Sequence, residues 1–231
     1  MKSRGHVARV SLVDRRDLVP SWSDPYLTLH RLRLVNRYAD GSESREYPYD
    51  VVLRKWLDAV ALVLVAEIDG APAVLLRSCV RPPLALRAEL DLPLPEPEPP
   101  AFLWELPAGL LEPGDRGEAG IRRRASLEAL EETGYRIDPA DFERRPGATL
   151  VSPGTVPERL YYLTARVARP HERAAPRGDG SAVEERAEVE WVPLDEALAM
   201  CDQGKIEDLK TELGIRRLAG ELPRSIEEAR R

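Results

Sequence analysis

The sequence predicts an α/β fold in which helices sandwich a mixed sheet, with a β-hairpin extension at the N-terminus. Three patterns lead to this prediction. Residues 59–67 form a nearly continuous apolar run, which is typical of a strand covered on both faces. Residues 26–38 alternate apolar and polar side chains, as a half-buried strand does. Three glutamates within residues 128–132 share one helical face, and Gly134 ends that helix.

The other elements are placed by turn residues and by the same two periodicities. Asp40-Gly41 predicts the turn into a return strand at 46–55. Asp69-Gly70 predicts the turn into the next strand, at 73–79. Later in the chain we expect strands at 159–168 and 187–193, and helices at 194–203 and 206–218.

Two segments are expected to be loops. Residues 82–100 are rich in proline, which predicts a stiff, extended segment without a regular element. Residues 169–186 are polar and rich in arginine, glycine and alanine.

From these elements we expect an N-terminal β-hairpin extension over 1–57 and one larger domain over 58–231.

The composition limits the classes of protein to consider. The chain has 231 residues, of which 43% are apolar, enough for a substantial core. Its formal charge of −6 provides no basic surface for nucleic acid. Its three histidines argue against a histidine metal site or a Ser-His-Asp triad. Cys79 and Cys201 lack metal-ligand spacing, so we expect packed thiols in a reducing compartment.

The sequence contains no segment typical of a membrane or secreted protein. The first residues lack the apolar stretch of a signal peptide, and no apolar run reaches membrane-spanning length. We therefore expect a cytoplasmic protein with neither a membrane nor a nucleic acid as partner.

Glu128, Glu131 and Glu132 are the main indication of chemistry. Like charges three or four residues apart cost about 0.2–0.5 kcal/mol per pair in an isolated helix. A bound cation offsets this cost, and carboxylate oxygens suit Mg²⁺ or Mn²⁺. The alternative is a solvated acidic face, which is common in a chain that is 32% charged.

The segment before these glutamates favours the metal site. Residues 104–115 read Trp-Glu-Leu-Pro-Ala-Gly-Leu-Leu-Glu-Pro-Gly-Asp, a short strand and a glycine-containing loop that lead into the helix. Together with the glutamates, this segment resembles the signature of the Nudix hydrolases, Gx5Ex7REUxEExGU, where U is a bulky aliphatic residue. Gly109 matches its first glycine, and Gly134 and Tyr135 match its end. The resemblance implies a Nudix-type α/β/α sandwich around a mixed sheet.

The match departs from the signature in three ways. Asp115 stands where the signature has glutamate, and four extra residues follow it, most simply within 116–120. Leu127 occupies the place of the signature arginine, which in the family supports the glutamates. Arg123 and Arg124 lie one turn earlier, and Arg124 is four residues before the first glutamate, a suitable ion-pair spacing. We hypothesise that one of them replaces the missing guanidinium.

Further phrases resemble the ADP-ribose and ADP-sugar pyrophosphatase branch of the family. They are residues 105–109 (Glu-Leu-Pro-Ala-Gly), residues 152–159 (beginning Ser-Pro-Gly-Thr), and residues 204–211 at the entry to the last helix. Val80-Arg81-Pro82 stands where that branch has Gln-Tyr-Arg-Pro. The resemblance implies substrate-binding roles for Arg81, Glu105 and Glu158.

The resemblance also implies a reaction. It is the Mg²⁺-dependent hydrolysis of a nucleoside diphosphate sugar, ADP-ribose or an ADP-sugar, to a nucleoside monophosphate and a sugar phosphate, with Mn²⁺ as the other suitable ion. Metal binding falls to Glu128, Glu132 and the carbonyl of Ala108, with Glu131 as a neighbour or an outer ligand.

In this branch the catalytic base is a glutamate on the loop before the last strand. Glu184 and Glu185 occupy that place, and we favour Glu185 slightly. For either residue the alternative is a solvated loop charge. The branch forms homodimers through its N-terminal hairpin, so the resemblance implies a homodimer here.

Two other functions remain open. A UDP- or GDP-sugar pyrophosphatase would carry the same signature, because nothing in the sequence identifies the base pocket. A Nudix fold that binds an ADP-ribose-like ligand without cleaving it is favoured by Leu127, by Asp115 and by the insertion. The three retained glutamates favour an enzyme.

Overall fold

The computed structural model describes residues 7–18, 26–94, 102–178 and 180–221. The chain divides into two compact units. Met1–Leu57 and Leu150–Arg159 form one, here called the N-terminal unit. The remaining residues, 58–149 and 160–231, form the main unit.

The N-terminal unit contains a three-stranded antiparallel sheet in the order β1-β2-β3. β2 (Leu27–Tyr38) and β3 (Tyr47–Arg54) form the predicted hairpin. Gly41 in their turn has a φ of +88°, which glycine adopts without strain. β1 (Val7–Leu18) adds a third strand that the sequence pattern does not predict. The extension is therefore a small sheet and not a single hairpin.

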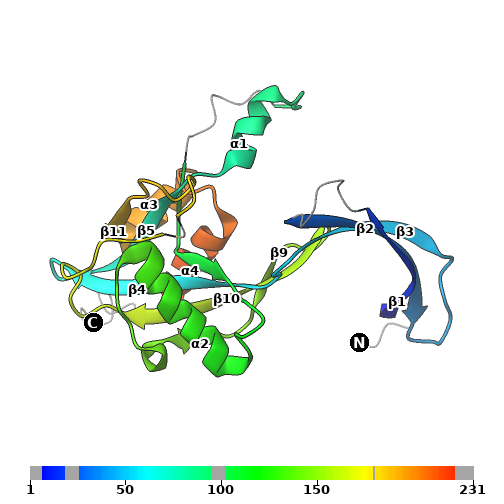
Figure 1. The fold of residues 1–231 in the computed structure, drawn as a ribbon, viewed down its shortest axis with the longest axis horizontal. Helices are drawn as coiled ribbons and strands as arrows, with labels where there is room; N and C mark the ends of the chain where they lie inside the picture. Colours follow the sequence, from blue (N-terminus) through cyan, green and yellow to red (C-terminus); the bar gives the residue numbers. More distant parts are fainter. Residues whose placement is uncertain (1–6, 19–25, 95–101, 179, 222–231) are drawn as a thin grey trace, which may run out of the picture. The chain divides into compact units, whose positions relative to one another are not determined.

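The main unit is built on the predicted mixed sheet, whose central path is β11-β5-β4-β10-β8. Figure 1 labels β11, β5, β4 and β10 of this path. β4 (Ala59–Ile68) pairs antiparallel with β5 (Ala71–Cys79) and parallel with β10 (Val156–Arg166). β11 (Val189–Pro193) pairs with the other edge of β5, and β8 (Glu143–Arg144) with β10.

Three short strands extend this sheet. β6 (Leu103–Glu105) pairs with β5, and β7 (Ala108–Leu110) with β4; β9 (Thr149–Ser152), most of which belongs to the N-terminal unit, pairs with β10. Between β4 and β5, Asp69 and Gly70 have φ values of +51° and +80°. Positive φ at both central residues is what a two-residue hairpin turn requires, so the Asp-Gly turn is confirmed.

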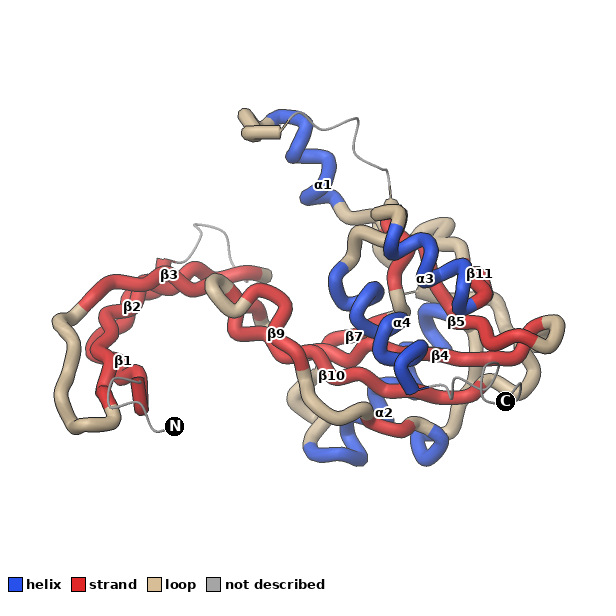
Figure 2. The backbone as a smooth tube through the Cα atoms, turned by 180° about the vertical axis from the view of Figure 1, so that it is seen from behind, coloured by secondary structure: helices blue, strands red, loops and turns tan. Residues whose placement is uncertain are grey.

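The helices cover both faces of the sheet (Figure 2). α2 (Gly117–Glu128) packs on one face against Leu62 and Leu64 of β4. α3 (Leu194–Asp202) and α4 (Leu209–Glu221) pack on the other. Residues 59–66 of β4 are all buried, as a strand covered on both faces must be.

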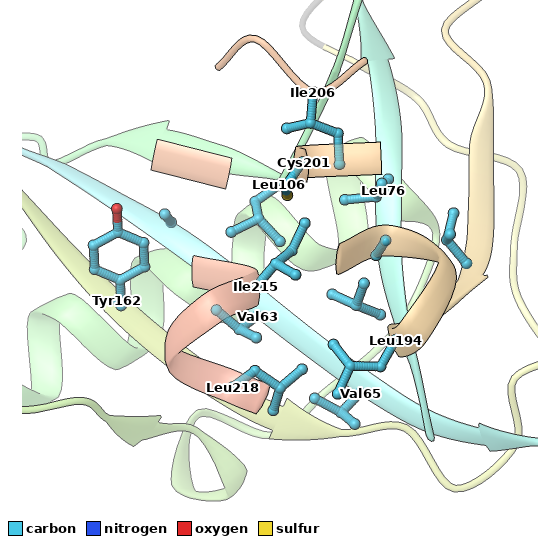
Figure 3. Packing of buried hydrophobic residues seen from close by; sticks show 14 of the residues in the cluster. Val63, Val65, Leu76, Leu106, Tyr162, Leu194, Cys201, Ile206, Ile215 and Leu218 are labelled. Atoms are coloured by element: carbon cyan, nitrogen blue, oxygen red, sulfur yellow. The ribbon is translucent and has the colours of Figure 1, made fainter. Parts of the chain in front are cut away.

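The core on the α3/α4 face is continuous (Figure 3). Val63 and Val65 of β4 meet Ile215 and Leu218 of α4, and Leu194 begins α3 beside them. Burying one such aliphatic side chain contributes roughly 1.5–3 kcal/mol. This core supports β4, which pairs with β7, and β5, which carries Arg77; both β7 and Arg77 belong to the site described below.

The prediction for residues 82–100 is wrong in its first half. α1 (Pro82–Leu86) and a 3₁₀ turn (Arg87–Glu89) replace the extended loop there. Two prolines at the start of α1 are compatible with a helix, because the first turn needs no N–H donor and proline's φ is already helical. Residues 95–101 lie outside the described part.

The cysteines and the hydropathy of the helices bear on the class of protein. Cys79 and Cys201 are buried free thiols, as predicted. No helix within the described residues is long and apolar enough to cross a bilayer.

The insertion in the signature begins helix α2. Four residues correspond to about one helical turn, and Gly117, the first residue of α2, has a φ of +64°. Gly120 is buried in the first turn, where an added Cβ would lie 2.4 Å from the carbonyl carbon of Asp115. The glycine therefore lets the preceding loop pack directly on the helix.

We predict that Gly120→Ala destabilises the protein by about 1–3 kcal/mol, because the methyl group meets rigid backbone. Gly220→Ala in α4 is the matched control, since an added Cβ there meets nothing within 4 Å. Urea unfolding of both variants tests this. A Gly120→Ala variant as stable as the wild type would contradict the close packing.

Candidate active site

The signature glutamates lie where helix α2 changes its winding. After Glu128 the chain continues as a π-helical turn, Ala129–Thr133, and ends at Gly134 with a φ of +80°. Single π turns are frequent at functional sites. An added Cβ at Gly134 would lie 1.9 Å from the carbonyl oxygen of Ala174. Both conformation and space therefore require glycine where the sequence predicts the helix end.

The carboxyl group of Glu128 lies directly on the backbone of β7. An added Cβ on Gly109 would lie 1.9 Å from Oε1 of Glu128. The Glu128 side chain is 13% exposed, so most of it is removed from water. The first glycine of the signature therefore has a steric reason: it leaves room for this carboxylate.

Glu132 lies deeper, and both of its carboxylate oxygens are bound. Oε1 accepts a hydrogen bond from Nη1 of Arg77, a buried residue of β5. Oε2 accepts one from the main-chain N–H of Ala108 at 2.8 Å. Glu132 thus connects the helix to β5 and to the start of β7.

The loop between β10 and β11 is attached to the end of this helix. The amides of Arg177 and Gly178 each donate a hydrogen bond to the carbonyl of Glu131 at 3.0 Å. The loop then brings Glu184 to Arg77, whose Nη1 donates to Oε1 of Glu184 at 3.1 Å. One guanidinium nitrogen therefore contacts a helix glutamate and a loop glutamate.

The two candidate bases differ in position. Glu184 is partly buried beside Arg77, whereas Glu185 is exposed. The slight preference for Glu185 on sequence grounds is therefore not supported by this geometry, which favours Glu184. Glu131 is also exposed, and its negative charge acts on Glu128.

The environment disfavours the charged forms of both helix glutamates. Burial raises the pKa of Glu128 to about 7; Arg124 opposes this shift, and Glu131 and Glu184 add to it. Burial raises the pKa of Glu132 to about 8, although Arg77 opposes this shift. Carboxylates that repel one another in a poorly solvated position are stabilised by a nearby cation.

These residues fit a hard divalent cation in kind and in charge. The available donors are oxygens, as Mg²⁺ and Mn²⁺ prefer. Among the described residues, no three Asp, Glu, His or Cys side chains converge on one point. Mg²⁺ usually keeps several waters and takes one or two protein carboxylates together with substrate phosphates. Glu128, Glu132 and the carbonyl of Ala108 are the groups that would hold it.

A second cluster of charges surrounds Glu105 at the end of β6. Arg81 donates two hydrogen bonds to the Glu105 carboxylate, at 2.7 and 2.6 Å, and Lys210 of α4 donates another. Burial would raise the pKa of Glu105, but these two cations outweigh it and hold the pKa below its usual value. Asp208 accepts from Lys210 at 2.8 Å and so fixes the ammonium group.

The comparison with protein families agrees with this geometry. A model of the NUDIX domain matches residues 59–212, which is more than half of the chain. The chain belongs to the Nudix family. The matched range includes β4, β5, helix α2 and both charge clusters of this Nudix protein.

Relatives with known names are similar over the same region. The GDP-mannose pyrophosphatase of Cronobacter sakazakii is 38% identical over 123 residues, which are 52% of this chain and 57% of that protein. The GDP-mannose pyrophosphatase of Yersinia enterocolitica is 37% identical over 115 residues, 49% and 53% of the two chains. The Nudix protein therefore spans little more than half the length of these curated relatives.

A solved structure shares the fold over a longer range. The crystal structure of an ADP compounds hydrolase has a TM-score of 0.60, at 13% sequence identity, and the match covers 94% of this chain and 96% of that one. The predicted Nudix-type α/β sandwich is thereby confirmed.

The altered signature positions of this Nudix protein have a structural explanation. Asp115 does not join the two glutamates; it accepts hydrogen bonds from Arg123 and Arg124, at 3.0 and 2.8 Å. Nη1 of Arg124 lies 3.6 Å from Oε1 of Glu128, while Leu127 is 41% exposed. Arg124 is therefore placed to do what the hypothesis requires, to support Glu128 from one turn earlier.

One residue of this site is not predicted from the sequence, and one residue predicted to bind substrate lies outside the main unit. Arg77 is the missed one; the available signal was a single charge inside an apolar strand, which rarely occurs without a partner. Lys210 lies in residues 204–211, which resemble the ADP-sugar branch, but the resemblance assigns it no role. Glu158 belongs to the N-terminal unit, where it pairs with Arg54.

We predict that Gly109→Ala lowers the affinity for Mn²⁺ and the rate of Mg²⁺-dependent turnover by about 100-fold each, because a misplaced ligand is costly. The new methyl group would displace only the end of the Glu128 side chain, so the fold should persist. Calorimetry, kinetics and circular dichroism measure the three quantities.

Gly114→Ala is the matched control for this prediction. Gly114 lies in the same loop, and an added Cβ there meets nothing within 4 Å. Equal Mn²⁺ affinity in the two variants would show that Gly109 does not make room for a metal ligand.

Proposed function

We propose that this protein is a Mg²⁺-dependent pyrophosphatase that cleaves the diphosphate of a nucleoside diphosphate sugar. The observation that carries the proposal is a pair of poorly solvated carboxylates, the buried Glu132 and the largely covered Glu128, held against Ala108 and Gly109 inside a Nudix domain. The products would be a nucleoside monophosphate and a sugar phosphate.

Two observations bear on which nucleotide sugar is the substrate, and they point to different nucleotides. The sequence phrases resemble the ADP-ribose and ADP-sugar branch, whereas the relatives at 37% and 38% identity are GDP-mannose pyrophosphatases. We therefore propose GDP-mannose and ADP-ribose as the first two substrates to compare. A UDP-sugar is the third.

In the proposed mechanism Glu128, Glu132 and the carbonyl of Ala108 would hold a divalent cation. The cation, when bound, neutralises charge on the phosphate oxygens and lowers the pKa of the attacking water. Glu184 accepts the proton from that water, since a loop glutamate that holds no metal remains a competent base. Arg124 keeps Glu128 in position.

The second charge cluster would bind the diphosphate. Arg81 is half exposed, so its guanidinium can bond a phosphate oxygen while Glu105 orients it. Lys210 is mostly buried and is fixed by Glu105 and Asp208. Glu105 therefore serves as the anchor of two cations, and contact with the sugar falls to the groups around it.

We predict that the purified protein with Mg²⁺ converts GDP-mannose to GMP and mannose 1-phosphate, or ADP-ribose to AMP and ribose 5-phosphate. Chromatography of the products tests this. Glu132→Gln should abolish turnover because it removes a charged ligand, whereas Glu118→Gln, an exposed change on the same helix, should retain it. Release of inorganic phosphate directly from the substrate would point to another reaction.

We predict that Glu184→Gln lowers kcat at least about 100-fold with little change in KM, because general-base catalysis contributes about 10²–10⁴-fold. Glu185→Gln is the matched control one residue away and should keep kcat within about threefold, as an exposed side chain that touches no substrate should. The opposite result would return the role to Glu185.

A second candidate function is the binding of a nucleoside diphosphate sugar without cleavage. Leu127 is exposed at the place of the signature arginine, and Asp115 is bound by Arg123 and Arg124 instead of facing the glutamates. Calorimetric binding of ADP-ribose or GDP-mannose with no product after long incubation would favour this function.

A homodimer through the N-terminal unit remains part of the proposal. Tyr26, Leu27 and Leu29 are exposed by 58%, 49% and 39%, and such apolar side chains are suitable for an interface. Light scattering of the purified protein gives its mass in solution. A cytoplasmic location remains a prediction from the sequence.

A further inference from the structure

Arg77 is the only charged residue of β5, and its side chain is 5% exposed. In the sheet it lies opposite Glu105 on one side and Val189 on the other. Arg77 therefore lies between β6, which carries Glu105, and β11, which follows the β10–β11 loop. It also contacts Glu132, one of the helix glutamates. A buried arginine in such a position needs partners to offset its desolvation.

The partners of Arg77 come from two separate elements. Its Nη1 bonds Glu132 of the π-helical turn and Glu184 of the loop, the latter at 3.1 Å. Its Nε is buried and has no hydrogen-bond partner among the described residues. A purely structural arginine in a core would be expected to use its donors more completely. Its geometry is instead arranged around two carboxylates.

Other contacts of the β10–β11 loop show how far the position of Glu184 depends on its bond to Arg77. Arg177 and Gly178 are tied to Glu131 by main-chain bonds, but these lie six residues or more before Glu184. Glu184 itself lies in a turn in which Arg186 has a φ of +64°. An added Cβ at Gly178 would lie 2.8 Å from Oε2 of Glu184, so the two sides of the loop are also closely packed. The bond to Arg77 joins the Glu184 carboxylate to β5, and hydrogen bonds between Glu188 and Ser78 attach the end of the loop to the same strand.

We propose that Arg77 is a positioning residue that holds Glu184 beside Glu132, in the π-helical turn that follows helix α2. Its guanidinium neutralises Glu132 and at the same time fixes the direction of the loop carboxylate. The loop glutamate is thereby presented beside the carboxylates of the helix and not to solvent. This role rests on the proposed function for the part that Glu184 plays in turnover.

The test compares Arg77→Met, Arg77→Lys and Glu184→Gln. In the metal-free protein, Arg77→Met should speed amide hydrogen exchange at residues 181–187 and leave exchange in β4 unchanged. With Mg²⁺ and the best substrate, kcat should fall about 100-fold while KM stays within about threefold, as expected for a misoriented catalytic group. Arg77→Lys should restore part of both, because it keeps the charge.

A double-mutant cycle separates positioning from a general effect on stability. If Arg77 acts through Glu184, Arg77→Met combined with Glu184→Gln should have no lower kcat than Glu184→Gln alone. Arg216→Met is the control, an exposed arginine of α4 that pairs with Asp202 and Glu212. It should change neither the loop nor kcat.

Three results would overturn the proposal. They are unchanged loop exchange in Arg77→Met, faster exchange throughout the sheet, and additive losses of kcat in the double variant. If Arg77→Met does not fold, the same criteria apply to Arg77→Lys. If the wild type cleaves no nucleotide sugar, the proposed function fails, and loop exchange alone still decides whether Arg77 holds Glu184.

Discussion

The site depends on how closely helix α2 approaches the backbone of β7. Glu128 lies where a side chain on Gly109 would be, and Glu132 is bonded to the N–H of Ala108. This approach is possible because position 109 has no Cβ and because the helix ends in a π turn capped by Gly134. The sheet that carries β7 is buried on both faces, so the backbone cannot move away from the carboxylates.

The charged side chains of the site form two groups that differ in their charge balance. Around Glu128 and Glu132 negative charge is in excess, and burial raises the pKa of both carboxyl groups. Around Glu105 two cations share one carboxylate, whose pKa is lowered against the effect of burial. The first group suits a divalent cation and the second suits a diphosphate. In the proposed function, the half-exposed guanidinium of Arg81 contacts the anionic substrate, although the protein is acidic overall.

Much of the fold could be predicted from local patterns. The apolar run at 59–67 became the central strand, and Asp69-Gly70 became a turn with two positive φ values, because these features depend on neighbouring residues only. Residues 82–100 were harder, since proline is compatible with both an extended segment and the first turn of a helix. β1 was missed because a strand at the edge of a small sheet depends mainly on pairing with its neighbour.

The amino-acid sequence by itself determined the family, the helix with its three glutamates and the loop that supplies Ala108 and Gly109, because the signature is a contiguous pattern. Only the tertiary structure decided which charges meet. Arg77 and Glu132 are 55 residues apart, and Arg77 and Glu184 are 107 apart. The proposed preference for Glu184 over Glu185 rests on the turn that brings Glu184 to Arg77. Contacts of this kind depend on the packing of distant elements, which periodicity and spacing do not record.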